Sequence, residues 1–181
     1  MNRNFPVFWG PDGTSDDGDS EIYHGTHPAS EPEVQAVVNY YNSLPNKVTA
    51  LEVHTCSQLL LYPFSGKPEF PAQPDLDNYR AISYKMAETI AKLRNTKYVV
   101  ANIYNDLYPS AGCAADFFYM PDNSTRTAYA LAVELSPTMV DSAEQCFILD
   151  DAEIEPVGKE ITPAFLDFIE FGSSNPLVNS R

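Results

Sequence analysis

The sequence is poor in basic residues. It has 11 Lys and Arg against 25 Asp and Glu, which gives a formal net charge of -14 over 181 residues. No cluster of Lys or Arg offsets this charge locally, so the chain would repel the phosphate backbone of a nucleic acid. Anionic membrane surfaces are disfavoured for the same reason. We therefore expect no nucleic-acid partner and no membrane partner.

Long apolar runs are also missing. No stretch approaches the ~20 residues that a membrane-spanning helix needs, and the first residues lack the apolar core of a secretory signal. With 44% hydrophobic residues, the chain is long enough for one sizeable domain or a large part of a bigger one. No internal repeat and no linker divides it, so we expect a single domain over residues 1–181.

Cysteine is scarce, and its placement excludes a cysteine-based metal site. Cys56, Cys113 and Cys146 have no metal-binding spacing, and their odd number leaves at least one of them unpaired. Their pairing and the compartment both stay open. The triplet Asn123-Ser124-Thr125 matches a glycosylation acceptor, a pattern that is common by chance and favours secretion only slightly.

The apolar residues recur in patterns typical of alternating helices and strands. In chain order we expect a helix between Ser30 and Pro45, a strand over 48–53, a helix from Asp75 or Asp77 to about Arg94, strands over 98–103 and 127–133, and a helix over 162–171. Alternation of this kind indicates an α/β sheet covered by helices on both faces.

Local signals predict where the first and last helices begin. Ser30 followed by Glu33 is a capping-box pattern, and Pro32 lies in the first turn, where its missing N–H is tolerated. Thr162 is the expected N-cap of the last helix, with Pro163 at its first position.

Two ionisable residues each follow an apolar strand. His54 comes after the strand over 48–53, and Glu134 comes after the strand over 127–133. Ligands of open α/β sheets gather at the carboxyl ends of the strands, so these two side chains could share one site. The alternative is structural: the imidazole caps the sheet and the carboxylate meets solvent.

Five strings in consistent order resemble the carboxypeptidase A/B family of zinc metallopeptidases. They are MNRNF at 1–5, YHGTHPASEPE at 23–33, VHTCSQLLLYP at 53–63, LYPSAG at 107–112 and AVEL at 132–135. The resemblance spans almost the whole chain and covers the C-terminal part of the family's catalytic domain. It implies an α/β fold with a zinc-carboxypeptidase-like mixed sheet flanked by helices, of which this chain is one N-terminally truncated domain.

The resemblance also implies an activity, the hydrolysis of the last peptide bond of peptides and proteins with Zn²⁺ as cofactor, outside the cell. His54 resembles the third zinc ligand, and Glu134 resembles the general base that takes a proton from zinc-bound water. Asn2 and Arg3 resemble the pair that binds the substrate's terminal carboxylate, a task suited to a planar guanidinium. Tyr108 resembles the tyrosine that folds over bound substrate.

Four residues resemble the lining of the pocket for the substrate's last side chain, and none is charged: Leu61, Leu107, Ala115 and Ala132. A family member that selects Lys or Arg would be expected to carry an acidic residue near Ala115, because a buried cation needs a partner. Asp116 is adjacent but resembles a family position outside that role. We therefore expect a preference for apolar or aromatic C-terminal residues; the alternative is that these four are ordinary core residues.

Part of the family's pattern has no counterpart here. The first two zinc ligands come from an upstream His-x-x-Glu string, and a catalytic zinc normally takes three protein ligands. The spacing of His24 and His27 indicates turn packing rather than metal binding. One ligand does not hold a catalytic zinc, so the chain alone is expected to be inactive.

Met1 stands where the family has an internal apolar residue. We therefore expect the full protein to continue upstream, with a signal and a propeptide. The alternative function is non-catalytic: an inert fragment, or a module that binds peptide C-termini through Asn2 and Arg3.

Overall fold

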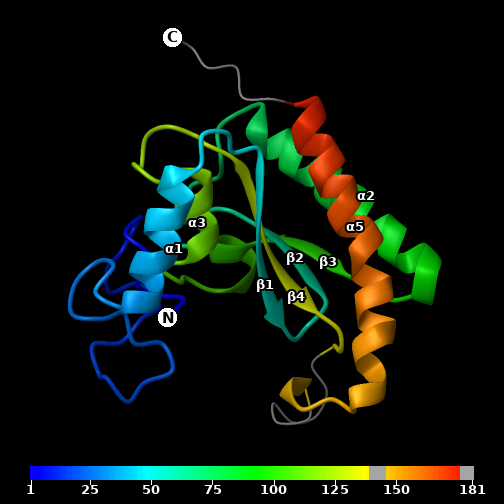
Figure 1. The fold of residues 1–181 in the computed structure, drawn as a ribbon, viewed down its shortest axis with the longest axis horizontal. Helices are drawn as coiled ribbons and strands as arrows, with labels where there is room; N and C mark the ends of the chain where they lie inside the picture. The colour runs from blue at the N-terminus through cyan, green and yellow to red at the C-terminus, as the bar shows by residue number, and fades with distance from the viewer. Residues whose placement is uncertain (139–145, 176–181) are drawn as a thin grey trace.

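The structure is a computed structural model that describes residues 1–138 and 146–175. Its elements in chain order (Figure 1) are α1 (Pro32–Ser43), β1 (Thr49–Thr55), β2 (Leu59–Tyr62), α2 (Asp75–Arg94), β3 (Val99–Asn102), the π-helical turn η1 (Ile103–Leu107), α3 (Ala114–Tyr119), β4 (Tyr129–Leu135), the 3₁₀ turn η2 (Asp151–Glu153) and α5 (Ile154–Ser174). None of the helices in the described ranges combines the length and the apolarity that a membrane span requires.

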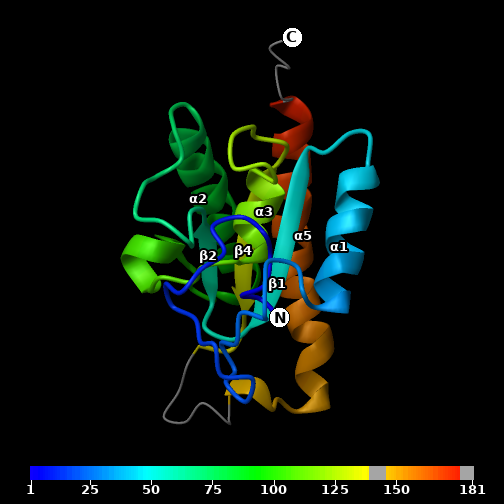
Figure 2. The same cartoon turned by 90° about the vertical axis from the view of Figure 1, so that its left-hand side faces the viewer.

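The four strands form one mixed sheet in the order β1-β4-β2-β3. Strand β1 is parallel to β4, whereas β2 is antiparallel to β4 and parallel to β3. Helices α2 and α5 cover one face of the sheet, and α3 with α1 outside it covers the other (Figures 1 and 2). This arrangement confirms the predicted mixed sheet flanked by helices.

Alternation along the strands divides the apolar residues between the two faces. Leu60 of β2 and Val133 of β4 belong to the main core, which lies under α2 and α5. The next residue of β2, Leu61, and the preceding residue of β4, Ala132, belong instead to a small cluster on the opposite face. That opposite face, beside α3, is where the site residues gather.

The predicted start of the last helix is wrong. Helix α5 begins at Ile154 rather than at Thr162, and it contains Pro163 in its interior. Its apolar face, which includes the buried Val157 and Phe168, packs against α2 and the sheet. That burial outweighs the one backbone hydrogen bond that the proline removes.

The capping box at α1 is also absent. The N-cap is Glu31, and the hydroxyl of Ser30 donates to the Glu31 carboxylate at 2.7 Å instead of to the helix backbone. Strand β2 and helix α3 were not predicted. Strand β2 has four residues and helix α3 has six. Segments this short do not show a hydrophobic periodicity that identifies the element.

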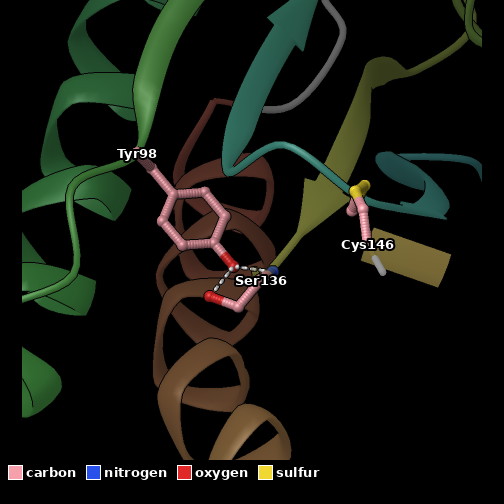
Figure 3. The surroundings of a disulfide bond; sticks show 4 residues. Tyr98, Ser136 and Cys146 are labelled. Carbon is pink, nitrogen blue, oxygen red and sulfur yellow. Dashed lines mark hydrogen bonds between the residues drawn. A yellow bond between two sulfur atoms is a disulfide. The ribbon is translucent and has the colours of Figure 1, made fainter. Parts of the chain in front are cut away.

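A disulfide joins Cys56 to Cys146, and Cys113 is a buried free cysteine. Cys56 directly follows β1, so the bond ties the end of that strand to the segment before α5. Beside it, the Ser136 backbone N–H donates to the hydroxyl of Tyr98 at 3.0 Å (Figure 3). Burial raises the pKa of Tyr98 to about 12, which keeps this hydroxyl neutral.

Reduction of this disulfide should lower the free energy of unfolding by about 2–4 kcal/mol, because the bond closes a loop with a sequence separation of 90 residues. Urea unfolding of the oxidised and reduced protein measures the difference. The Cys56→Ser variant is the control, since its stability should not respond to reductant. Equal midpoints for oxidised and reduced wild type would contradict the prediction.

Candidate active-site cleft

The two ionisable strand-end residues lie side by side. Strands β1 and β4 are parallel neighbours in a register that pairs His54 with Glu134 and Glu52 with Ala132. Alternate residues of a strand point to the same side, so Glu52 and His54 share one face of β1. The imidazole and the Glu134 carboxyl group therefore stand at the same sheet edge, where the sequence predicts a joint site.

A cleft of about 350 Å³ opens at this edge. Its lining includes every predicted site residue except Ala115: Asn2, Arg3, His54, Leu61, Leu107, Tyr108, Ala132 and Glu134. Tyr108 is 53% exposed and stands at the rim, so it does not pack in the core. Leu61 and Ala132 are buried and form part of the interior wall.

The placement of Ala115 departs from the prediction. Its side chain is completely buried in the cluster with Leu61 and Ala132 and does not reach the cleft surface. Its backbone N–H donates to Glu52 Oε2 at 2.8 Å. The packing of α3 on β1 thus brings a carboxylate from a distant part of the sequence to the backbone of Ala115.

Glu52 is the site residue that the sequence reasoning missed. It is 9% exposed and lines the cleft. The signal was present in the sequence, because an acidic residue two positions before His54 in a strand must share the histidine's face. An acidic side chain inside an apolar run is costly to bury without a role or a partner.

The Glu52 carboxylate orients the imidazole. His54 Nε2 lies 2.7 Å from Glu52 Oε1 and 3.2 Å from Asn2 Nδ2. A carboxylate only accepts, so Nε2 carries the proton, and in the neutral ring Nδ1 is then the nitrogen available to a metal.

The hydrogen bond to Glu52 raises the pKa of His54, against the effect of burial. Burial raises the pKa of Glu134, and nearby His54 partly offsets that rise.

The N-terminal segment is held beside the sheet by buried polar contacts, near the lower end of β1 in Figure 2. Asn4 is completely buried, and its amide donates to the carbonyls of His24 and His27 at 2.7 and 2.9 Å. Asn2 Oδ1 accepts from the Ala114 backbone N–H at 2.9 Å. The two histidines thus serve the loop through their backbone, in agreement with the predicted turn packing.

Arg3 reaches the cleft with neutral partners. Its guanidinium donates to the carbonyls of Gly13 and Asn2 at 3.2 and 2.5 Å and lies 3.6 Å from Cys113 Sγ. None of the ion pairs within residues 1–138 and 146–175 involves it. A partly buried cation without a carboxylate partner is suited to an anionic ligand.

The described residues do not form a complete zinc site. In residues 1–138 and 146–175, no three His, Cys, Asp or Glu side chains are grouped so that they could hold a metal ion. His54 Nδ1 fits one position of a catalytic zinc, which normally takes three protein ligands. The donor set of these residues alone therefore does not fit the metal.

Comparison with solved structures identifies the class of fold. The chain superposes on bovine thrombin-activatable fibrinolysis inhibitor, solved in complex with tick carboxypeptidase inhibitor, with a TM-score of 0.84 and 25% identity over 97% of this chain and 57% of that one. The carboxypeptidase A of Helicoverpa armigera gives a TM-score of 0.78 over 96% of this chain and 41% of that one, with 23% identity. The fold is that of part of a carboxypeptidase.

Sequence comparison gives the family. The zinc carboxypeptidase family model matches residues 1–164. Mouse carboxypeptidase A4 is 34% identical over 88% of this chain and 36% of its own length, and pig carboxypeptidase A1 is 32% identical over 97% and 39%. The chain belongs to the zinc carboxypeptidase family. It spans less than half the length of these curated relatives.

Proposed function

We propose that this chain forms the substrate-binding and proton-transfer side of the active site in a zinc-dependent carboxypeptidase, which hydrolyses the last peptide bond of its substrates. The observation that carries the proposal is the juxtaposition of His54 and Glu134 in register, in one cleft with the guanidinium of Arg3, which has no ion-pair partner among the described residues. Family membership supports the metal-dependent peptidase class.

In this proposal the residues of the chain have separate tasks. Arg3 and Asn2 bind the terminal carboxylate, and the guanidinium can do so through two parallel hydrogen bonds. Glu134 accepts a proton from the attacking water and passes it to the leaving amine; its raised pKa suits it to both steps. Tyr108, exposed at the rim, covers the bound residue. His54 would supply one ligand to a zinc ion, and the ion would contribute polarisation of the scissile carbonyl and a lowered pKa of water.

Residues 1–181 would then be part of one catalytic domain, and His54 would supply one of three zinc ligands. Secretion is proposed from the family resemblance. The predicted preference for apolar or aromatic C-terminal residues depended on the absence of an acidic residue near Ala115. Glu52 accepts from the Ala115 backbone N–H and does not take the place of its side chain, and Leu61, Leu107 and Ala132 give the cleft an apolar lining, so we retain this preference as part of the proposal.

A second candidate is a non-catalytic protein that binds peptide C-termini. It is favoured by one observation, the lack of a three-ligand metal group in the described ranges. Arg3 and Asn2 would act in the same way in both candidates, but no bond would be cleaved.

Zinc titration with a chromogenic peptide separates the two candidates. We expect the 181-residue chain to bind a peptide with a free C-terminal carboxylate, but not the same peptide as its C-terminal amide. Metal-dependent turnover by these residues would refute the non-catalytic candidate. Equal binding of the acid and the amide would refute the assigned carboxylate site, and with it the proposed function.

A further inference from the structure

One motif of the sequence takes no part in the cleft. Asn123-Ser124-Thr125 is the only Asn-x-Ser/Thr triplet of the 181 residues in which the middle residue is not proline. It lies in the loop between α3, which ends at Tyr119, and β4, which begins at Tyr129. In Figure 1 this is the yellow-green loop at the upper end of β4. The motif is therefore available for a role separate from the cleft.

The backbone of this loop is fixed on both sides of Asn123. The Asp122 carboxylate accepts from the backbone N–H groups of Ser124 and Thr125 at 2.9 and 2.7 Å. The Asn123 N–H donates to the Met120 carbonyl at 2.9 Å. Asn123 has a positive φ of 59°, a conformation that asparagine adopts more readily than most residues. The loop thus forms a defined turn with the asparagine at its tip.

The Asn123 carboxamide is free to react. Residues 122–125 are all exposed. Among the described residues, the side-chain hydrogen bonds of this turn involve Asp122, Ser124 and Thr125 but not the Asn123 amide. The motif requires a hydroxyl two residues after the asparagine, and that of Thr125 is exposed, 3.4 Å from the Ser124 hydroxyl. No buried contact has to break before a large group is attached at this position.

The disulfide is an independent indication of the compartment. A disulfide such as Cys56–Cys146 is typical of proteins that fold in the oxidising secretory pathway and is rare in the cytosol. Asparagine glycosylation modifies surface residues of secreted proteins. The chain therefore combines an exposed acceptor motif with a covalent feature of the compartment in which such motifs are used.

We propose that Asn123 is an N-glycosylation site. Asn123 Nδ2 forms a bond to C1 of the first sugar of an oligosaccharide that is carried on a lipid diphosphate. The bond between C1 and the diphosphate oxygen breaks, and the proton lost from the amide leaves with the lipid diphosphate. Of the proposed function, this inference depends only on secretion and not on the assigned carboxylate site.

The modified position lies away from the cleft. Glu134 stands five residues after Tyr129 on β4, which is roughly 17 Å at the rise of a strand. Asn123 precedes Tyr129, at the other end of that strand. Of the described residues, none between Cys113 and Ala132 belongs to the lining of the cleft. The bulky, polar glycan therefore covers the loop before β4 and leaves the cleft open.

Expression of the 181-residue chain with an added secretion signal in cultured animal cells tests the proposal. Digestion with peptide N-glycosidase in water enriched in the heavy oxygen isotope removes the glycan and leaves labelled aspartate at the modified position. We expect a faster electrophoretic band after digestion and, by tandem mass spectrometry, the label at position 123. Protein retained in the cells is digested in the same way, so the result does not depend on efficient secretion.

Two pairs of variants make the result specific to the motif. Asn123→Gln and Thr125→Ala should abolish the modification, because they remove the acceptor amide and the required hydroxyl. Ser124→Ala and Thr125→Ser should retain it, since the middle position is variable and serine also satisfies the third. An unmodified Asn123 in the wild type, or a Thr125→Ala variant that is glycosylated like the wild type, overturns the proposal.

A binding measurement checks the placement of the glycan and separates this proposal from the proposed function. In isothermal titration, Nα-acetyl-phenylalanine should bind the glycosylated and the digested chain with equal affinity. Weaker binding by the glycosylated chain would contradict a glycan that lies away from the cleft. Absence of binding by both forms overturns the carboxylate site on Arg3 and leaves the glycan at Asn123 standing. An unmodified Asn123 with intact ligand binding overturns only the glycosylation.

Discussion

Arg3→Ala should weaken the binding of ligands with a free C-terminal carboxylate by about 10- to 150-fold, which corresponds to the roughly 1.5–3 kcal/mol of a hydrogen bond to a charged group. Among the residues that the structure describes, the partners of the guanidinium are neutral: two backbone carbonyls and the sulfur of Cys113. When it binds an anion, it therefore exchanges hydrogen bonds to neutral groups for stronger hydrogen bonds to a charged group. Isothermal titration with Nα-acetyl-lysine measures the effect.

Two matched variants make this result specific. Arg3→Lys keeps the charge but not the planar fork, so its affinity should lie between those of the wild type and Arg3→Ala. Arg80→Ala removes an exposed arginine of α2 and should leave the affinity unchanged. An Arg3→Ala variant that binds the ligand as tightly as the wild type would show that the carboxylate is bound elsewhere.

Asp116→Ala should lower the free energy of unfolding by about 3 kcal/mol or more. The Asp116 carboxylate is completely buried and accepts from the backbone N–H and hydroxyl of Ser65 and from the Gly66 N–H, at 2.8–3.0 Å. Alanine leaves these donors without their acceptor, and each buried unpaired donor costs about 1–3 kcal/mol. Urea unfolding at pH 7 measures the loss.

The exposed Asp16→Ala is the control and should change stability by less than about 0.5 kcal/mol.

The pH dependence of stability is a second readout. Burial raises the pKa of Asp116 to about 6, so between pH 4 and 6 the folded state retains a proton that the unfolded chain releases. The proton-linked part of the stability is therefore present below pH 4 and falls as the pH rises through that range, while the ionised carboxylate still accepts its hydrogen bonds at pH 7. Asp116→Asn, which does not titrate, should remove that part of the slope; identical pH profiles would contradict the assignment.

The regular elements could be predicted where the apolar pattern is long. Helix α2 begins at Asp75 and ends at Arg94. Its apolar residues recur at helical spacing over these twenty residues, and this pattern predicts both ends. The start of α5 could not be predicted from local signals. Thr162 and Pro163 look like a helix start in isolation, and only the packing of α5 on α2 shows that the helix continues through them.

The part of the candidate site that lies on strands could be predicted from the apolar pattern, and the part in irregular segments could not. His54 and Glu134 each end an apolar strand, and the parallel pairing of β1 with β4 brings them together. Asn2 and Arg3 lie in an irregular segment, where periodicity gives no information, and only the family resemblance indicated them. The contact between Glu52 and Ala115 joins residues 63 positions apart in the sequence, so it required the strand order and the place of α3.

The central claim is that the cleft holds the C-terminal residue of a peptide, with its carboxylate on Arg3 and its peptide bond beside Glu134. A crystal structure of the chain with bound Nα-acetyl-lysine tests it most directly. The account predicts the ligand's carboxylate within hydrogen-bonding distance of the Arg3 guanidinium and the ligand's stem against the cleft lining of Leu61 and Ala132. A ligand bound outside the cleft, or with its carboxylate directed away from Arg3, would contradict the account.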